Sequence, residues 1–287
     1  MTTTLKLWLN TIKTTLTNIG GLIVFAILYA LLLGSAYFFI ATREATVWQV
    51  VVTYTLLILL PVEFFIFQAS ILGHALDRKF HWRAIAVNAF KCLVVTIPIL
   101  LLAWGIYFLL NKWQLRYQLP TLVLNVPAGP PKSQPLHWPT LLFGTLRFIL
   151  FGIALPLATI HLWILVAGRE ARTLFEGGAK SFFKRVGNAI SNAFASESVL
   201  IYALGLIFFA LVPYLLLFVP VTVKGNKTDF TIFILRLVLS FGFTLIGWIV
   251  TVSTLARSAS SAPEARHIVA PGVSPGTSSI SEVPSLL

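Results

Sequence analysis

Three ionisable side chains lie inside otherwise apolar stretches of the sequence, and their types could do chemistry together. They are Glu63, Lys91 and His161. A carboxylate with an ammonium or imidazole partner can relay protons or hold a polar substrate, and such groups are costly inside a bilayer. At 1.5 Å per helical residue, each lies about 6–8 Å from the inner end of its apolar stretch. The pattern therefore predicts a polar, cytoplasm-facing cavity between the second, third and fourth spans.

A structural role for the same residues stays open. The long side chain of Lys91 can extend to the lipid headgroups, and Glu63 can simply pair with it. Such a pair would lock two adjacent helices together without any ligand. A shared depth does not establish that the three side chains face one another.

Two arginines form a second level near the opposite membrane surface. Arg147 and Arg236 lie about 9–10 Å from the outer ends of their spans, and Asp229 lies nearer that surface. Because no carboxylate shares their depth, the pair predicts a site for an anion such as a lipid headgroup phosphate. The alternative is that both side chains extend outward to the surface, one of them toward Asp229.

Prolines interrupt four of the apolar stretches and predict helix kinks. They are Pro61, Pro98, Pro156 and Pro213. Proline frees a backbone carbonyl, and broken helices line the sites of many transporters. Pro61, two residues before Glu63, is the placement that most favours a site.

Motifs for known enzyme chemistry are lacking. The segment Gly272-Val273-Ser274-Pro275-Gly276 matches a nucleophile elbow in letters, but Pro275 has no N–H to stabilise an oxyanion. No phosphate-binding loop, metal-binding histidine pair or redox cysteine pair occurs, and Cys92 is the single cysteine. The sequence therefore predicts no catalytic residue, no metal and no cofactor.

The elements that would position these residues follow from composition. Of 287 residues, 57% are hydrophobic and 10% are charged, whereas soluble domains are roughly 25% charged. The mean hydropathy is +0.90. These values exclude a soluble globular protein and predict an all-α, polytopic integral membrane protein. The net charge of +12 is then typical of basic flanks that meet anionic headgroups, and it does not indicate nucleic acid.

Six apolar stretches are long enough to cross a hydrocarbon core of about 30 Å as helices. The predicted spans are 19–40, 47–68, 87–110, 140–166, 198–220 and 230–255. They form one transmembrane domain, 19–255, between an amphipathic segment, 1–18, and a Ser/Pro/Gly-rich tail, 256–287, that is predicted to be disordered. The connection from Asn111 to Pro139 contains six prolines and is predicted to be extended.

The distribution of basic residues predicts the orientation. Twelve Lys and Arg residues flank the spans on the side of the termini, and six lie in the loops on the other side. By the positive-inside rule, both termini are cytoplasmic. We expect a multi-pass protein of a plasma membrane or bacterial inner membrane.

A basic, aromatic, amphipathic stretch precedes each outward span. The three stretches begin near Leu5, Asp77 and Lys180. Such segments lie at the membrane surface, with aromatic residues toward the lipid and basic residues at the phosphates. Residues 88–90 and 192–194 share the letters Asn-Ala-Phe, a match that fits either three repeated units or coincidence in an apolar chain.

The functional interpretation is a small permease or transporter-like protein with a polar, cytoplasm-facing cavity. The alternative is a non-catalytic membrane scaffold or lipid-binding partner protein, with a second membrane protein or another copy of the chain as partner. An intramembrane enzyme is the least favoured class, because no nucleophile and base occur together.

Overall fold

The computed structural model describes residues 2–43, 46–77, 80–117, 138–168, 178–219 and 226–261. Within these ranges the chain is almost entirely helical, and six helical stretches are long and apolar enough to cross a membrane. The prediction of an all-α, polytopic membrane protein is thus confirmed. The helices are α1 (Thr2–Thr17), α2 (Ile19–Ala41), α3 (Val47–Asp77), α4 (Trp82–Arg116), α5 (Trp138–Arg147), α6 (Leu155–Ala167), α8 (Gly178–Ala193), α9 (Ser196–Leu206), α10 (Val212–Phe218) and α11 (Asn226–Ser261).

Two spans contain a π-helical segment. The segment η1 (Phe148–Ala154) joins α5 to α6, and η2 (Ile207–Leu211) joins α9 to α10. Each is followed within two residues by a proline at the start of the next helix, Pro156 or Pro213. By contrast, α3 and α4 continue as single helices through Pro61 and Pro98.

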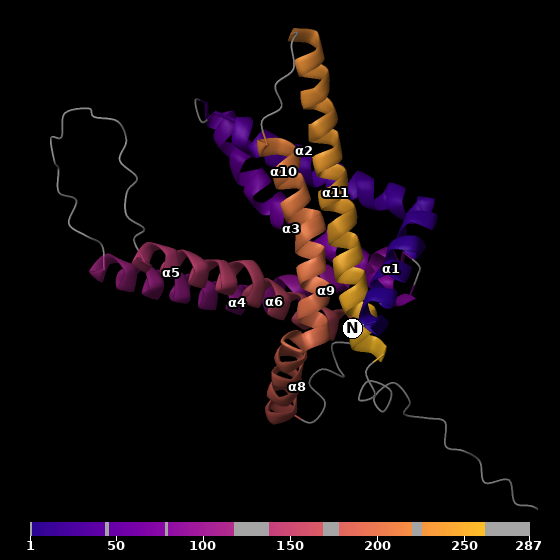
Figure 1. The fold of residues 1–287 in the computed structure, drawn as a ribbon, viewed down its shortest axis with the longest axis vertical. Helices are drawn as coiled ribbons and strands as arrows, with labels where there is room; N and C mark the ends of the chain where they lie inside the picture. Colours follow the sequence, from indigo (N-terminus) through magenta and orange to yellow (C-terminus); the bar gives the residue numbers. More distant parts are fainter. Residues whose placement is uncertain are drawn as a thin grey trace, which may run out of the picture.

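The spans are arranged as three antiparallel hairpins. One consists of α2 and α3, the second of α4 with α5–η1–α6, and the third of α9–η2–α10 with α11. The hairpins lie close together at one end and diverge toward the other (Figure 1). The N-terminus and the last turns of α11 lie at the end where they meet.

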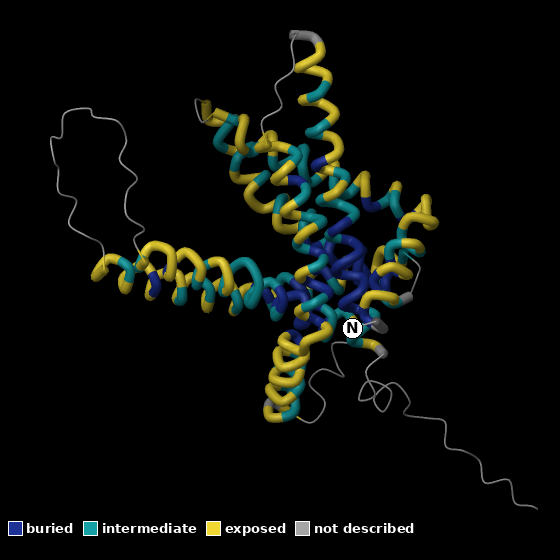
Figure 2. Tube along the Cα trace, in the orientation of Figure 1, coloured by how far each residue is buried: buried dark blue, intermediate teal, exposed yellow. Residues whose placement is uncertain are grey.

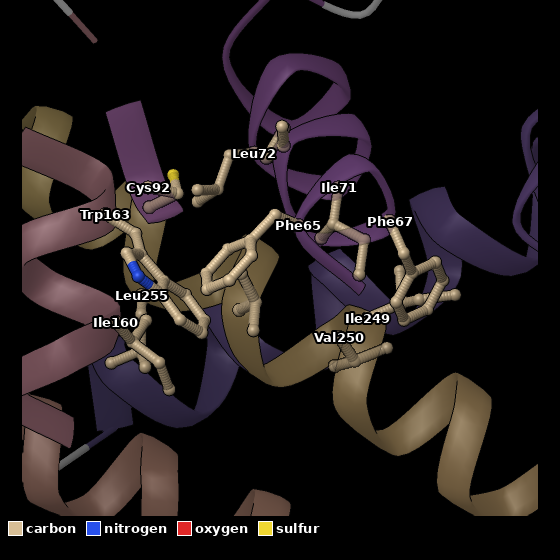
Figure 3. Close-up of a cluster of buried hydrophobic side chains, with 14 of the residues drawn as sticks. Phe65, Phe67, Ile71, Leu72, Cys92, Ile160, Trp163, Ile249, Val250 and Leu255 are labelled. Carbon is tan, nitrogen blue, oxygen red and sulfur yellow. The ribbon is translucent and has the colours of Figure 1, made fainter. Parts of the chain in front are cut away.

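The buried core lies where the hairpins meet (Figure 2). We call this set of buried side chains the hub. Figure 3 shows part of it, with Phe65 and Leu72 from α3, Trp163 from α6 and Leu255 from α11. Trp8 of α1 and Phe25 of α2 complete the hub. Every hairpin therefore contributes to a single core at one end of the molecule.

Two helices are enclosed on all sides within the hub. Residues 67–72 of α3 and 249–256 of α11 are all buried. Several are hydroxyl residues, which bond to the carbonyl one turn earlier: Ser70 to Ile66, Thr251 to Gly247 and Thr254 to Val250, at 2.6–2.7 Å. Because each of these hydroxyls is satisfied within its own helix, the hub can bury them without water.

Glycines allow the third hairpin to close tightly. A Cβ at Gly205 of α9 would overlap the Thr251 side chain, and one at Gly247 of α11 would lie 2.9 Å from the Phe209 nitrogen. Small residues at such crossings let helix backbones approach closely in membrane proteins. A Cβ at Gly242, earlier on α11, would meet no atom within 4 Å, so the close approach is confined to one part of the helix.

The amphipathic helices α1 and α8 share one pattern of burial. In α1, Thr4, Trp8 and Thr11 are buried. In α8, Ala193 is buried and Phe182 and Val186, which precede it on the same face, are half-buried. Beside this face each helix has an exposed apolar stripe: Leu5, Leu9 and Leu16 in α1, and Phe183 and Ile190 in α8. Trp8 thus packs into the hub, where the centre of its ring lies 5.1 Å from the centre of the Phe208 ring. It does not share the exposed face of Leu5 and Leu16.

Several segment boundaries differ from the predicted ones, and α3 continues to Asp77 where the sequence predicts an end at residue 68. Residues 111–116 continue α4, whereas the sequence predicts a loop from Asn111. The segment near Asp77 is no separate helix, since α3 ends there and α4 begins at Trp82. Residues 256–261 continue α11, because the hub buries Ala256. The rest of the Pro-rich loop, 118–137, and of the tail, 262–287, lies outside the described residues.

We expect Gly205→Ala to destabilise the protein, because the added methyl group collides with the buried Thr251 side chain. Overpacking of this kind costs about 1–3 kcal/mol. Gly242→Ala is the matched control: its Cβ meets open space, and helix propensity alone would stabilise it by up to about 1 kcal/mol. Unfolding midpoints in detergent measure both, and an equal midpoint for the two variants would contradict the close crossing.

Candidate functional site

Glu63 lies on α3 and bonds to the other helix of its own hairpin. The Ser35 hydroxyl of α2 donates a 3.0 Å hydrogen bond to Glu63 Oε1. The second carboxyl oxygen, Oε2, is buried and has no hydrogen-bond partner among the described residues. Glu63 therefore connects α2 to α3 and keeps one acceptor unused.

Lys91 is half-buried near the start of α4. Its Nζ donates to Asn88 Oδ1, at 3.2 Å, one turn earlier on the same helix. This contact turns the ammonium group toward the end of the helix at which α4 begins. It is the direction expected of a lysine that extends from a span toward the membrane surface.

His161 is buried on α6 and connects two hairpins. Its Nδ1 lies 3.0 Å from the Leu157 carbonyl oxygen, and its Nε2 lies 3.2 Å from Ser198 Oγ of α9. A carbonyl can only accept, so Nδ1 carries a proton and donates to Leu157. The contact between Nε2 and the Ser198 hydroxyl fastens α6 to α9.

These hydrogen bonds tie Glu63, Lys91 and His161 to different partners, and none of them joins two of the three residues. A polar cavity shared by the three stays a prediction, and none of these contacts supports it. The contacts that the structure gives to Glu63 and His161 are those of residues that hold helices together.

The two arginines also have local partners. Arg147 Nη2 donates to Asn111 Oδ1 at 3.4 Å, and its guanidinium lies 5.6 Å from the centre of the Tyr107 ring. Its buried Nε has no hydrogen-bond partner among the described residues. Arg236 donates from Nε and Nη2 to the carbonyls of Leu216 and Val219. It therefore caps the C-terminal end of α10, and its contacts are with those carbonyls and not with Asp229.

One proline-freed carbonyl has an interhelical partner. Pro156 has no N–H to bond to the Gly152 carbonyl one turn earlier. The Tyr202 hydroxyl of α9 donates to that carbonyl at 2.9 Å. The π-helical segment η1 thus becomes a contact point between the second and third hairpins, which agrees with the way neighbouring helices satisfy proline-freed groups in membranes.

We expect Tyr202→Phe to lower the unfolding free energy by about 0.6–1 kcal/mol, the usual range for an interhelical hydrogen bond in a membrane protein. The variant keeps the ring and removes the donor to Gly152. Tyr214→Phe, at an exposed tyrosine of α10, is the control and should leave stability unchanged. Equal stability of all three proteins in denaturant titrations would show that the bond contributes nothing.

A polar cluster that no sequence pattern indicates lies where α1, α2, α3 and α11 meet. Asn18 Nδ2 lies 3.0 Å from His74 Nε2, and Arg257 Nη1 donates to Thr14 Oγ1 at 3.1 Å. These groups line a small cavity. They lie far apart in the chain and outside the predicted spans or at their ends, so only the packing of the hub reveals the cluster.

Cys92 reports on access to the hub. It is fully buried on α4 and lies near Leu72 and Trp163 (Figure 3). Its carbonyl accepts from Thr96 Oγ1 at 2.6 Å, and that hydroxyl accepts from Trp163 Nε1 at 2.8 Å. The surroundings of the thiol are therefore packed side chains with satisfied polar groups.

We expect a membrane-impermeant maleimide to leave Cys92 unlabelled in the folded protein and to label it fully after denaturation. Full burial of the thiol is the reason. The protein is labelled in membrane fragments whose two faces are both accessible to the reagent. Mass spectrometry of the intact chain then measures the labelled fraction. Rapid labelling of the folded protein would show that water reaches the hub and would restore the case for a cavity.

Neither the chemistry of the described residues nor similarity to known proteins assigns a reaction. In the described part of the chain, no group of three His, Cys, Asp or Glu residues could hold a metal ion. No protein-family model matches the chain, and no curated protein or solved structure is significantly similar to it.

Proposed function

We propose that the chain is a non-catalytic membrane scaffold that binds lipid between its hairpins. The observation that carries this proposal is the exposure of apolar side chains around the outer halves of the spans. In α4, Leu100, Leu101, Leu102 and Trp104 are all exposed. Successive helical residues point about 100° apart, so this part of α4 is uncovered on nearly every side.

The same holds for the other hairpins. The most apolar stretch of 18 residues in α2 has a mean hydropathy of 2.4, and only 6% of its residues are buried. In the third hairpin, Tyr214 and Phe218 of α10 and Phe230 and Phe233 of α11 are exposed. Apolar surface of this extent requires an apolar solvent. Lipid chains between diverging hairpins supply it.

The charged end of the molecule supports a cytoplasmic hub. Lys6 and Lys13 of α1 and Lys180 and Lys184 of α8 are exposed at the end where the hairpins meet. They adjoin the exposed apolar stripes of these helices, an arrangement typical of helices at an anionic membrane surface. Together with the positive-inside rule, this arrangement supports the proposal that both termini are cytoplasmic.

A permease is the second candidate, and Glu63 is the observation that favours it. An intramembrane carboxyl with one unused oxygen can exchange a proton or bind a cation. The other contacts favour the scaffold, because the hydrogen bonds of His161 and Tyr202 hold the hairpins together at a packed hub.

We expect the purified chain to retain phospholipid through repeated gel filtration in a maltoside detergent, with the same amount retained by Glu63→Gln. The amide oxygen of the glutamine would still accept the Ser35 hydrogen bond, so the hairpin is preserved. Phosphorus analysis and native mass spectrometry measure the retained lipid. In parallel, liposomes containing either protein and an entrapped pH-sensitive dye should show no proton flux above protein-free liposomes. A lipid-free protein would contradict the scaffold, and proton flux abolished by Glu63→Gln would establish the permease.

A further inference from the structure

A small polar cavity lies in the hub where α1 meets α2. Its volume is about 20 Å³, which is space for one water-sized group and not for an organic substrate. Polar side chains from α1, α3, α11 and the α1–α2 junction line it: Thr14, Thr15, Asn18, His74, Ser253 and Arg257.

The cation of this cavity is Arg257. Its guanidinium is permanently charged, and its Nη1 lies 3.1 Å from Thr14 Oγ1 and 3.5 Å from Thr11 Oγ1. The two hydroxyls of α1 thus orient the planar group at the cavity wall. A guanidinium oriented in this way directs its N–H donors in a fixed geometry, which suits the oxygens of a phosphate.

The contact with Asn18 determines which ring nitrogen of His74 carries the proton. Its Oδ1 accepts from the Gly21 N–H at 3.0 Å and so caps the start of α2. Its Nδ2 therefore points to His74, where the ring nitrogen Nε2 at 3.0 Å can only accept. The proton of His74 then lies on Nδ1, and the imidazole is neutral in this arrangement.

The N-terminal end of α2 adds to the same electrostatic field. The helix begins at Ile19 and has 23 residues. Its dipole places positive charge at the residues that line the cavity, Asn18 and Gly21. A permanently charged guanidinium, the Thr15 hydroxyl and a helix N-terminus thus border one small space, and this combination suits an oxyanion.

We propose that this cavity binds one oxygen of a phosphate group, with Arg257 as the charged ligand. The site lies at the beginning of the first span, where the headgroups of a bilayer crossed by that span are expected. The phosphate therefore comes either from a phospholipid headgroup or from free phosphate, and the chemistry of recognition is the same. In its headgroup form the inference rests on the proposed lipid-binding function.

The test is the thermal unfolding midpoint of the full chain in a neutral maltoside detergent at constant ionic strength. We expect a rise of several degrees with inorganic phosphate, with short-chain phosphatidic acid, or with both. A rise with both assigns free phosphate as a sufficient ligand, and a rise with the lipid alone assigns the headgroup. No rise with either ligand would overturn the proposal.

Four variants localise the effect. Arg257→Gln should abolish the rise, whereas Arg83→Gln, at an exposed arginine of α4, should preserve it. Thr15→Val removes one cavity hydroxyl at constant shape and should weaken binding about tenfold, the usual loss for a hydrogen bond to a charged group. Thr17→Val is its control, since that exposed hydroxyl bonds to the carbonyls of Lys13 and Thr14. The site would also be overturned by one combined result. Thr15→Val and Thr17→Val would show equal rises of the unfolding midpoint, and Arg257→Gln would keep its rise.

The same variants separate this site from the scaffold function. Lipid held between the hairpins does not depend on Arg257. If Arg257→Gln loses the response to phosphate and keeps its copurifying lipid, both proposals stand. If the wild-type protein retains lipid without any response to phosphate, the cavity proposal alone fails.

Discussion

The structure depends on one constraint: two helices must be buried on every side at the same end of the molecule. Residues 67–72 of α3 and 249–256 of α11 meet this requirement with apolar side chains and with hydroxyl residues among them. Thr251 and Thr254 return their hydrogen bonds to their own helix, and Gly205 and Gly247 let α9 and its continuation approach closely. Without these features the three hairpins would have no common core.

Some polar residues within the spans connect different hairpins. Trp248 Nε1 of the third hairpin donates to Gln68 Oε1 of the first at 2.9 Å. His161 and Ser198 join the second hairpin to the third. Interhelical hydrogen bonds contribute only about 0.6 kcal/mol each on average in membranes. Their value is therefore in selecting which helices meet, while packing at the hub provides most of the stability.

The number and class of elements could be predicted from the sequence, because the bilayer requires about twenty apolar residues per helix and leaves the backbone no alternative. The partners of Glu63 and His161 could not be predicted. The depth of a residue along its helix follows from its residue number. The neighbour that its side chain faces depends on how the adjacent helices are rotated and how they cross. Ser35 and Ser198, the partners found, are ordinary residues in their spans. The burial of Trp8 could not be predicted for a related reason, since amphipathic periodicity does not distinguish a lipid-facing stripe from a core-facing one.

Distances between the hairpins at their two ends test this account most directly. Spin labels on pairs of exposed residues, Phe38 with Phe108 and Phe108 with Phe218, would report the outer ends in a background with Cys92→Ala. A pair of exposed residues at the other ends of the first two hairpins, Ile19 with Trp82, would report the hub end. Packed helices lie about 8–10 Å apart, so a parallel bundle predicts similar separations at both ends. Pulsed electron paramagnetic resonance in lipid nanodiscs should instead give outer distances that exceed the hub distance by much more than one helix spacing. Equal distances at both ends would contradict the divergence of the hairpins and the lipid-binding function proposed from it.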